Sequence, residues 1–360
     1  MSGNGAVTKA AVLEALREVQ DPVFEKNLVE LDVVHDIEID GDEVALRVVL
    51  TTPAHPYWEK IENDVRQALD SLEGVGSVDL SMEAEVPADG RERKSDGEIK
   101  NAIAVGSGKG GVGKTTVAVN LAVALAQSGA SVGLLDADVY GPNVPTMLGV
   151  DSMPAPSEEK MNPAEAYGVK IISIAFLVKP GQPLIWRGPM LHSAIGQFIT
   201  DVAWGNLDYL VVDLPPGTGD AALSLAQALP LSGSVIVTLP QAISLEDASR
   251  GLEMFRTMDV PVLGVVENMS YLELDDGSRV DVFGTGGGQQ LAEETDTTFL
   301  GAIPMDPAVR QAGDSGVPVV VSHPDSKVAK ALVEVSKRIA GNVIRYAIKA
   351  GDDIKLEIMD

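Results

Sequence analysis

The 360-residue sequence predicts an α/β protein in which helices cover both faces of a mostly parallel sheet, preceded by a small N-terminal α/β domain. Two observations support this prediction. Beyond residue 99, short and almost continuously apolar strands alternate with helical stretches, which is typical of parallel strands buried on both faces. The composition also changes near Pro87, where a charged stretch without apolar periodicity separates the first part of the chain from the rest.

The first part, residues 1–86, contains the elements of a compact α/β domain. Apolar residues at helical spacing follow Thr8, a typical N-cap, and Asp40-Gly41-Asp42 between two alternating segments is a strong hairpin signal. The expected elements are a helix from Thr8 to Val19, strands from Leu31 to Ile39 and Val44 to Leu50, a helix from Pro56 to Leu72 and a strand from Val75 to Met82.

The rest of the chain divides into a linker, a larger domain and a tail. The mixed charges of residues 87–98 predict a tether, residues 99–350 form the larger α/β domain, and residues 351–360 form an acidic tail. Expected elements of the larger domain include strands at Val132 to Leu135, Tyr209 to Val212, Val235 to Val237 and Val262 to Val266, and helices at Thr116 to Ala126, Ala221 to Leu229, Leu245 to Met258 and Ser326 to Ala350.

A glycine-rich loop joins the first strand of this domain to the helix that follows it. The segment from Gly108 to Thr115 satisfies G-x-x-x-x-G-K-[ST], a loop whose backbone N–H groups converge on phosphate oxygens at a helix N-terminus. Lys114 is expected to reach the β- and γ-phosphates and Thr115 to ligate magnesium. The sequence therefore predicts a P-loop NTPase that binds ATP and Mg²⁺. The expected contacts are Gly108, Lys109, Gly110, Gly111, Val112, Gly113, Lys114, Thr115 and Thr116.

Carboxylates follow two of the predicted strands, at the edge of the sheet where ligands of parallel α/β folds gather. Asp213 ends the run Tyr209-Leu-Val-Val, and in this order behind a phosphate loop it is expected to hold magnesium directly or through water. Asp136 follows another strand. We expect it either to support the magnesium shell or to serve a turn or a helix cap.

Composition limits the function classes. Acids outnumber bases by 53 to 27, and a net charge of −26 disfavours partners such as nucleic acid or an anionic membrane. No apolar run approaches a membrane span, so we expect a cytoplasmic protein with a solvated acidic surface suited to high salt. The absence of cysteine excludes disulfides, thiolate catalysis and cysteine-held iron–sulfur ligands from this chain alone.

Several motifs together carry a resemblance to a known family. Lys109 resembles the signature lysine of the deviant Walker A group, the MinD/Mrp/ParA-like ATPases. Within that group the chain is similar to the Mrp/ApbC family of iron–sulfur cluster carriers. The motifs are Asp136-Ala-Asp-Val-Tyr-Gly-Pro-Asn143, Trp186-Arg-Gly-Pro-Met190, Asp213-Leu-Pro-Pro-Gly-Thr-Gly-Asp220, Glu267-Asn-Met-Ser270 and Phe283-Gly-Thr-Gly-Gly-Gly288.

This resemblance implies an ATPase that works as a homodimer and passes iron–sulfur clusters from assembly proteins to client apoproteins. It implies that Lys109 crosses the dimer interface to the partner's nucleotide, as a finger residue supplied in trans does. Asp138 would orient or deprotonate the attacking water, and Asn268 would contact the adenine. The first domain is similar to the MIP18-like (DUF59) domain through Asp21-Pro-Val-Phe and Leu50-Thr-Thr-Pro-Ala-His-Pro56.

The sequence departs from the family pattern where the cluster would bind. Leu274 and Gly277 stand where the family usually has C-x-x-C, and His55 replaces a cysteine of the DUF59 motif. A histidine can ligate iron, but a lone loop histidine is more often exposed or capped. We therefore expect ATP-dependent action in cluster delivery without iron–sulfur ligands in this chain. The alternatives are a nucleotide-gated adaptor and, less favoured by the acidic surface, a partition or positioning ATPase.

Overall fold

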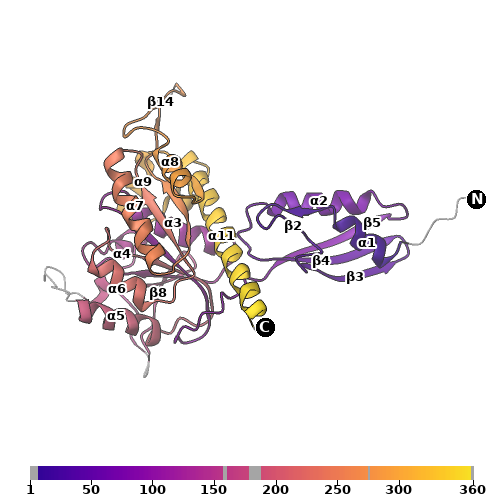
Figure 1. Cartoon of the computed structure of the whole chain (residues 1–360), viewed down its shortest axis with the longest axis horizontal. Coiled ribbons are helices and arrows are strands. Elements are labelled where there is room, and N and C mark those ends of the chain that lie inside the picture. Colours follow the sequence, from indigo (N-terminus) through magenta and orange to yellow (C-terminus); the bar gives the residue numbers. More distant parts are fainter. Residues whose placement is uncertain (1–6, 157–159, 178–187, 275, 358–360) are drawn as a thin grey trace, which may run out of the picture.

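The computed structural model describes residues 7–156, 160–177, 188–274 and 276–357. A small domain containing α1 and α2 lies beside a larger α/β domain, and helix α11 (Lys327–Glu357) lies on the side of the larger domain that faces the small one (Figure 1). No helix in the described ranges combines the length and apolarity needed to cross a lipid bilayer.

The main sheet of the small domain has the order β3-β4-β5, with β3 antiparallel and β5 parallel to β4, and β1 and β2 form a separate antiparallel pair. Thr8 caps α1 as predicted, because its hydroxyl accepts the N–H of Ala11, and Gly41 turns the predicted hairpin with a φ of +65°. Strand β3 begins three residues later than predicted, since Asp32 has a positive φ of 54° and interrupts an extended backbone there. The elements are α1 (Lys9–Leu16), β1 (Gln20–Asp21), β2 (Lys26–Asn27), β3 (Val34–Asp40), β4 (Glu43–Leu50), α2 (Trp58–Asp70) and β5 (Ser77–Ala84).

The larger domain is built on an eight-stranded sheet in the order β15-β12-β11-β6-β10-β7-β9-β8. Every pairing in it is parallel except that of the edge strand β8 with β9. The predicted mostly parallel sheet is therefore confirmed. Its strands are β6 (Ile99–Ser107), β7 (Val132–Asp136), β8 (Ala164–Ala166), β9 (Val169–Ser173), β10 (Leu207–Asp213), β11 (Gly233–Thr238), β12 (Val262–Glu267) and β15 (Phe299–Ala302).

Two apolar cores lie on opposite faces of this sheet. One core packs α3, α10 and α11 against the strands, and the other packs α5, α6, α7 and α8. Both faces are thus covered, which explains why the central strands are apolar along their whole length. The helices are α3 (Lys114–Gln127), α4 (Val144–Met147), α5 (Gly188–Thr200), α6 (Asp220–Ala228), α7 (Ala242–Thr257), α8 (Gly287–Glu294), α9 (Pro307–Ser315) and α10 (Val319–Ser322), with a 3₁₀ turn at Ile174–Leu177.

The predicted tether, residues 87–98, is held against the larger domain by hydrogen bonds. Arg93 is 2% exposed and pairs with Asp89 at 2.7 Å. Its guanidinium also donates to the carbonyl oxygens of Pro230 and Ile99, both at 2.9 Å. Pro230 is 137 residues away from Arg93 in the sequence, and the local composition of the linker gives no sign of this contact.

The small domain also contacts the larger one directly. Tyr209 in β10 donates its hydroxyl hydrogen to Thr52 at 2.8 Å. Ala54 and Val86 belong to the same apolar core as α3 and α11. At the other end of the chain, α11 continues to Glu357, so residues 351–357 extend this helix and do not form a separate tail. Of the motif from Trp186 to Met190, the first two residues lie outside the described residues.

Candidate nucleotide site

The predicted phosphate loop connects the end of β6 to the first residue of α3, Lys114. Two of its glycines are required by neighbouring atoms. A Cβ on Gly108 would lie 2.0 Å from the carbonyl carbon of Asp247, and one on Gly113 would lie 2.2 Å from the side-chain nitrogen of Asn268. Gly113 also has a φ of +83°, which residues with a side chain rarely adopt. Glycine therefore lets this loop pass close to α7 and to the end of β12.

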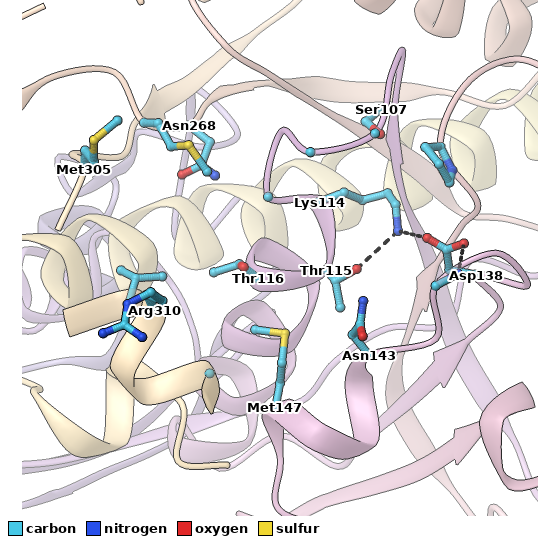
Figure 2. A pocket seen from close by; sticks show the side chains of 18 of the residues that line it. Ser107, Lys114, Thr115, Thr116, Asp138, Asn143, Met147, Asn268, Met305 and Arg310 are labelled. Carbon is cyan, nitrogen blue, oxygen red and sulfur yellow. Dashed lines mark hydrogen bonds and ion pairs between the residues drawn. The ribbon is translucent and has the colours of Figure 1, made fainter. Parts of the chain in front are cut away.

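Charged and hydroxyl side chains from three elements meet beside this loop. The Nζ of Lys114 lies 2.6 Å from Oδ1 of Asp213 and 3.3 Å from Oδ2 of Asp138. Thr115 donates its hydroxyl hydrogen to the other oxygen of Asp213 at 2.7 Å. Figure 2 shows Lys114 directed towards Asp138 and Thr115. Hydroxyl and carboxylate oxygens are ligands that Mg²⁺ prefers, so the pair of Thr115 and Asp213 fits the predicted metal.

Asp136 lies behind this cluster, opposite Asp213 in the pairing of β7 with β10. Burial, reinforced by the charge of Asp213, raises the pKa of Asp136 to about 7. Burial also raises the pKa of Asp213, an effect that the charge of Lys114 opposes. Three carboxylates therefore share the single ammonium group of Lys114, and a further cation at this edge of the sheet would relieve their mutual repulsion.

The hydrogen bonds of Asp136 are those of a turn and a helix cap. Its Oδ1 accepts the N–H of Asp138 at 3.2 Å. Its Oδ2 accepts the hydroxyl of Ser173 at 2.8 Å and the N–H of Val144, the first residue of α4, at 3.3 Å. These contacts match the capping alternative, and a part for Asp136 in the magnesium shell stays a prediction.

A cavity of about 890 Å³ opens in front of the phosphate loop. The predicted residues that line it are Lys109, Gly110, Gly111, Gly113, Lys114, Thr115, Thr116, Asp138 and Asn268. Two other predicted contacts lie outside this lining. Gly108 packs against α7, while Val112 is buried and uses its carbonyl oxygen to accept the side-chain N–H of Asn268 at 2.8 Å.

The far wall of the cavity was not predicted from the sequence. It comes from α4, α9 and the loop after β15, and includes Met147, Met305, Asp306 and Arg310. Figure 2 shows Asn268 and Met305 at one end of the cavity and Lys114 with Asp138 at the other. No motif marks this wall, since Met147 is more than a hundred positions from Met305 and Arg310 along the chain and meets them only through the fold.

The positions where the family would place cysteines lie in a small hairpin of β13 (Leu272–Glu273) and β14 (Arg279–Val280). Leu274 is 44% exposed, and its carbonyl oxygen accepts the N–H of Gly277 at 2.9 Å. Neither side chain can ligate iron. In the described part of the chain, no three His, Asp or Glu side chains lie close enough together to hold a metal ion.

His55 is buried, so of the two expectations for a lone loop histidine, exposed or capped, exposure is wrong. It is 1% exposed, and its Nε2 lies 3.2 Å from a carboxylate oxygen of Asp21. Its Nδ1 accepts the N–H of Tyr57 at 3.3 Å, which is a form of the expected cap. The two motifs of the DUF59 resemblance thus meet through one side-chain pair. The burial arises because the loop that carries His55 packs against the larger domain.

The strand order and the placement of the glycine loop define the larger domain as a P-loop NTPase of the MinD type. It resembles the nucleotide-binding protein of Archaeoglobus fulgidus, solved in complex with ADP, with a TM-score of 0.53 and 40% identity over 61% of this chain and 87% of that chain. The cell division ATPase MinD of Pyrococcus furiosus gives a TM-score of 0.52 and 25% identity over 66% of this chain and 98% of that chain.

The chain belongs to the family of NUBPL iron-transfer P-loop NTPases, whose model matches residues 98–340. A second model, described as iron-sulfur cluster assembly protein, matches residues 9–80. The iron-sulfur cluster carrier protein of Synechocystis sp. is 52% identical over 95% of this chain and 99% of its own length. The protein of the same name from Escherichia coli is 39% identical over 93% of this chain and 92% of its own.

Proposed function

We propose that this protein binds and hydrolyses ATP and acts in the delivery of iron–sulfur clusters. The observation that carries the nucleotide part is the meeting of Lys114, Thr115 and Asp138 at the cavity beside the glycine loop. The buried Asp213 contacts both Lys114 and Thr115. The loop amides and Lys114 bind the phosphates, while Thr115 and Asp213 hold Mg²⁺. The metal, when bound, neutralises charge on the phosphate oxygens.

Asp138 is the residue that we assign to the attacking water. It lines the cavity and its side chain is 10% exposed. In the proposed reaction, a water oxygen bonds to the γ-phosphorus while the bond to the β,γ-bridging oxygen breaks and ADP leaves. The carboxylate of Asp138 orients this water and accepts its proton. Lys109 lies at the cavity wall and, in a homodimer, its ammonium contacts the nucleotide bound to the second copy. Because a monomer lacks this contact, its ATP turnover is slow.

Two lysines of one loop give a matched test of this proposal. Lys114→Ala removes a nearly buried ammonium from the phosphate site, so Mg-ATP binding measured by calorimetry should be lost. Lys109→Ala should leave the affinity within a few-fold but lower turnover on the order of 10³-fold, because a finger residue acts on the transition state. Unchanged ATP affinity in Lys114→Ala would refute the site. Equal turnover in Lys109→Ala and the wild type would refute the proposal that Lys109 acts on the nucleotide of the second copy.

The cluster part of the proposal rests on family membership and on the name of the close relatives. The proposed partners are cluster assembly proteins and client apoproteins. Since this chain has no cysteine, the thiolates that hold a cluster would have to come from a partner. That observation favours a second candidate function, a nucleotide-gated adaptor that brings partners together without holding the cluster itself.

A further inference from the structure

Glu267 is a buried carboxylate that the proposed reaction does not use. It ends β12, is 1% exposed, and its Oε2 accepts the N–H of Gly288 at 2.6 Å. Its Oε1 accepts the hydroxyl of Ser270. The chain between these contacts leaves the sheet, forms the β13–β14 hairpin and returns to α8. One side chain therefore joins the two ends of the segment that carries the hairpin.

The glycines of the Phe283 to Gly288 motif make this contact possible. A Cβ on Gly288 would lie 2.8 Å from the Cβ of Glu267, and one on Gly287 would lie 2.4 Å from the carbonyl oxygen of Pro240. The accepted N–H belongs to the first turn of α8, where backbone donors lack helical partners and favour a negative charge. The Glu267 to Ser270 motif and the Phe283 to Gly288 motif are thus joined by a single carboxylate.

The same segment forms part of the nucleotide cavity. Asn268, next to Glu267 in sequence, donates its side-chain N–H to the carbonyl oxygen of Val112 in the phosphate loop. Met269 and Leu272 line the cavity, and the backbone of Leu272 forms an isolated parallel β-bridge with that of Met305 on the far wall. A change at the cavity wall therefore acts on the residues from which the hairpin starts.

We infer that Glu267 is a positioning residue that holds Asn268 against the phosphate loop and couples the nucleotide cavity to the β13–β14 hairpin. The inference rests on the proposed ATP site. Glu267 does not line the cavity, so it acts through Asn268 and Ser270. The hairpin presents Leu274 in its turn and Val280 in β14, which are 44% and 42% exposed. Binding of ATP in the cavity thereby changes the position of this exposed hairpin.

The first test compares two ligands and two substitutions. Mg-ATP contacts the whole cavity, whereas inorganic tripolyphosphate reaches only the phosphate loop. Glu267→Ala should weaken ATP binding about ten-fold, because it releases both hydrogen-bonded ends of the segment, and should change tripolyphosphate binding less than about two-fold. Glu267→Gln should restore ATP binding, since its oxygen can accept the N–H of Gly288 and its nitrogen can donate to Ser270.

The second test follows the hairpin itself. The chain has no cysteine, so a Val280→Cys variant carries a single fluorescent label in β14. ATP should shift the emission of this label in the Glu267 and Glu267→Gln backgrounds but not in Glu267→Ala. The control is a label on a Tyr57→Cys variant, because Tyr57 lies in the small domain and is 41% exposed. The emission of this label should not change when ATP binds.

The outcomes separate this inference from the proposed function. If wild-type protein binds ATP and Glu267→Ala does so equally well, with the same response of the label, the positioning role is wrong and the ATP site stands. If wild-type protein does not bind ATP, the proposed function fails and the coupling fails with it. Should Glu267→Ala not fold, Ser270→Ala, which removes one of the two contacts, should still weaken ATP binding by about three-fold. No loss in Ser270→Ala would then refute the role.

Discussion

Asp136 illustrates at the residue scale how burial turns a carboxylate into a pH-sensitive group. Its pKa rises from 3.8 to about 7, chiefly through desolvation. A carboxyl group whose pKa is raised on folding binds its proton more tightly in the native state. Its contribution to stability is therefore fully present below about pH 4 and is lost as the pH rises towards 7.

Asp136→Asn removes this titration and keeps a similar shape. The free energy of unfolding of the wild type, relative to that of the variant, should fall by up to about 1.4 kcal/mol per pH unit between about pH 4 and 7. Urea unfolding at a series of pH values measures this difference. Asp325→Asn is the matched control, because Asp325 is fully exposed and should give a difference that hardly changes with pH. A pH-independent difference for Asp136→Asn would contradict the argument.

The residues of the site differ in how far the sequence could predict them. Lys114, Thr115 and Asp213 follow from local motifs, because the spacing of the glycine loop and the apolar strand before the aspartate fix where these side chains lie. The surroundings of Asp136 and His55 depend on residues that are distant in the sequence, so two alternatives stay open for each side chain at the level of the sequence.

At the scale of elements, the loop from Thr51 to Pro56 shows how the two domains are joined. Thr52 accepts the hydroxyl of Tyr209, and Ala54 packs into the core of the larger domain. His55 stabilises the loop from within through Asp21 and the backbone N–H of Tyr57. The pair of His55 and Asp21 is therefore expected to have a structural role.

His55→Ala should lower the free energy of unfolding by at least about 2 kcal/mol, because it leaves a cavity and deprives a buried carboxylate of its partner. Denaturant unfolding followed by tryptophan fluorescence measures the effect, since Trp58 begins the next helix, α2. His323→Ala is the control, because His323 is exposed, and its effect should stay within about 0.5 kcal/mol. Equal stability of the two variants would show that the buried pair contributes little.

The regular elements were predicted well where local patterns specify them. Thr8 caps its helix and Gly41 turns its hairpin, since both act on neighbouring backbone groups. The fixed linker was not predictable, because Arg93 finds the carbonyl of Pro230 at a separation of 137 residues. The far wall of the cavity was missed for the same reason, as Met147 and Arg310 meet only when α4 packs against α9.

At the scale of the whole molecule, the protein combines a candidate nucleotide site with a surface that lacks the cysteine thiolates needed to hold an iron–sulfur cluster. The chain carries a net charge of −26, so two copies repel each other unless salt screens them or a cation binds between them. The phosphate loop and the β13–β14 hairpin share no residue. ATP binding and the ability to hold a cluster can therefore be separated by experiment.

Iron–sulfur clusters select thiolate ligands, which the chain lacks, so the purified protein should stay colourless after anaerobic reconstitution with iron and sulfide, while it still binds ATP. The double substitution Leu274→Cys and Gly277→Cys should give absorbance and iron content near one cluster per two chains. The hairpin can accept it, because no atom of the described residues lies within 4 Å of a Cβ at Gly277, although its φ of +81° adds some strain. A stoichiometric cluster on the wild-type protein would contradict the prediction and would require ligands other than cysteine.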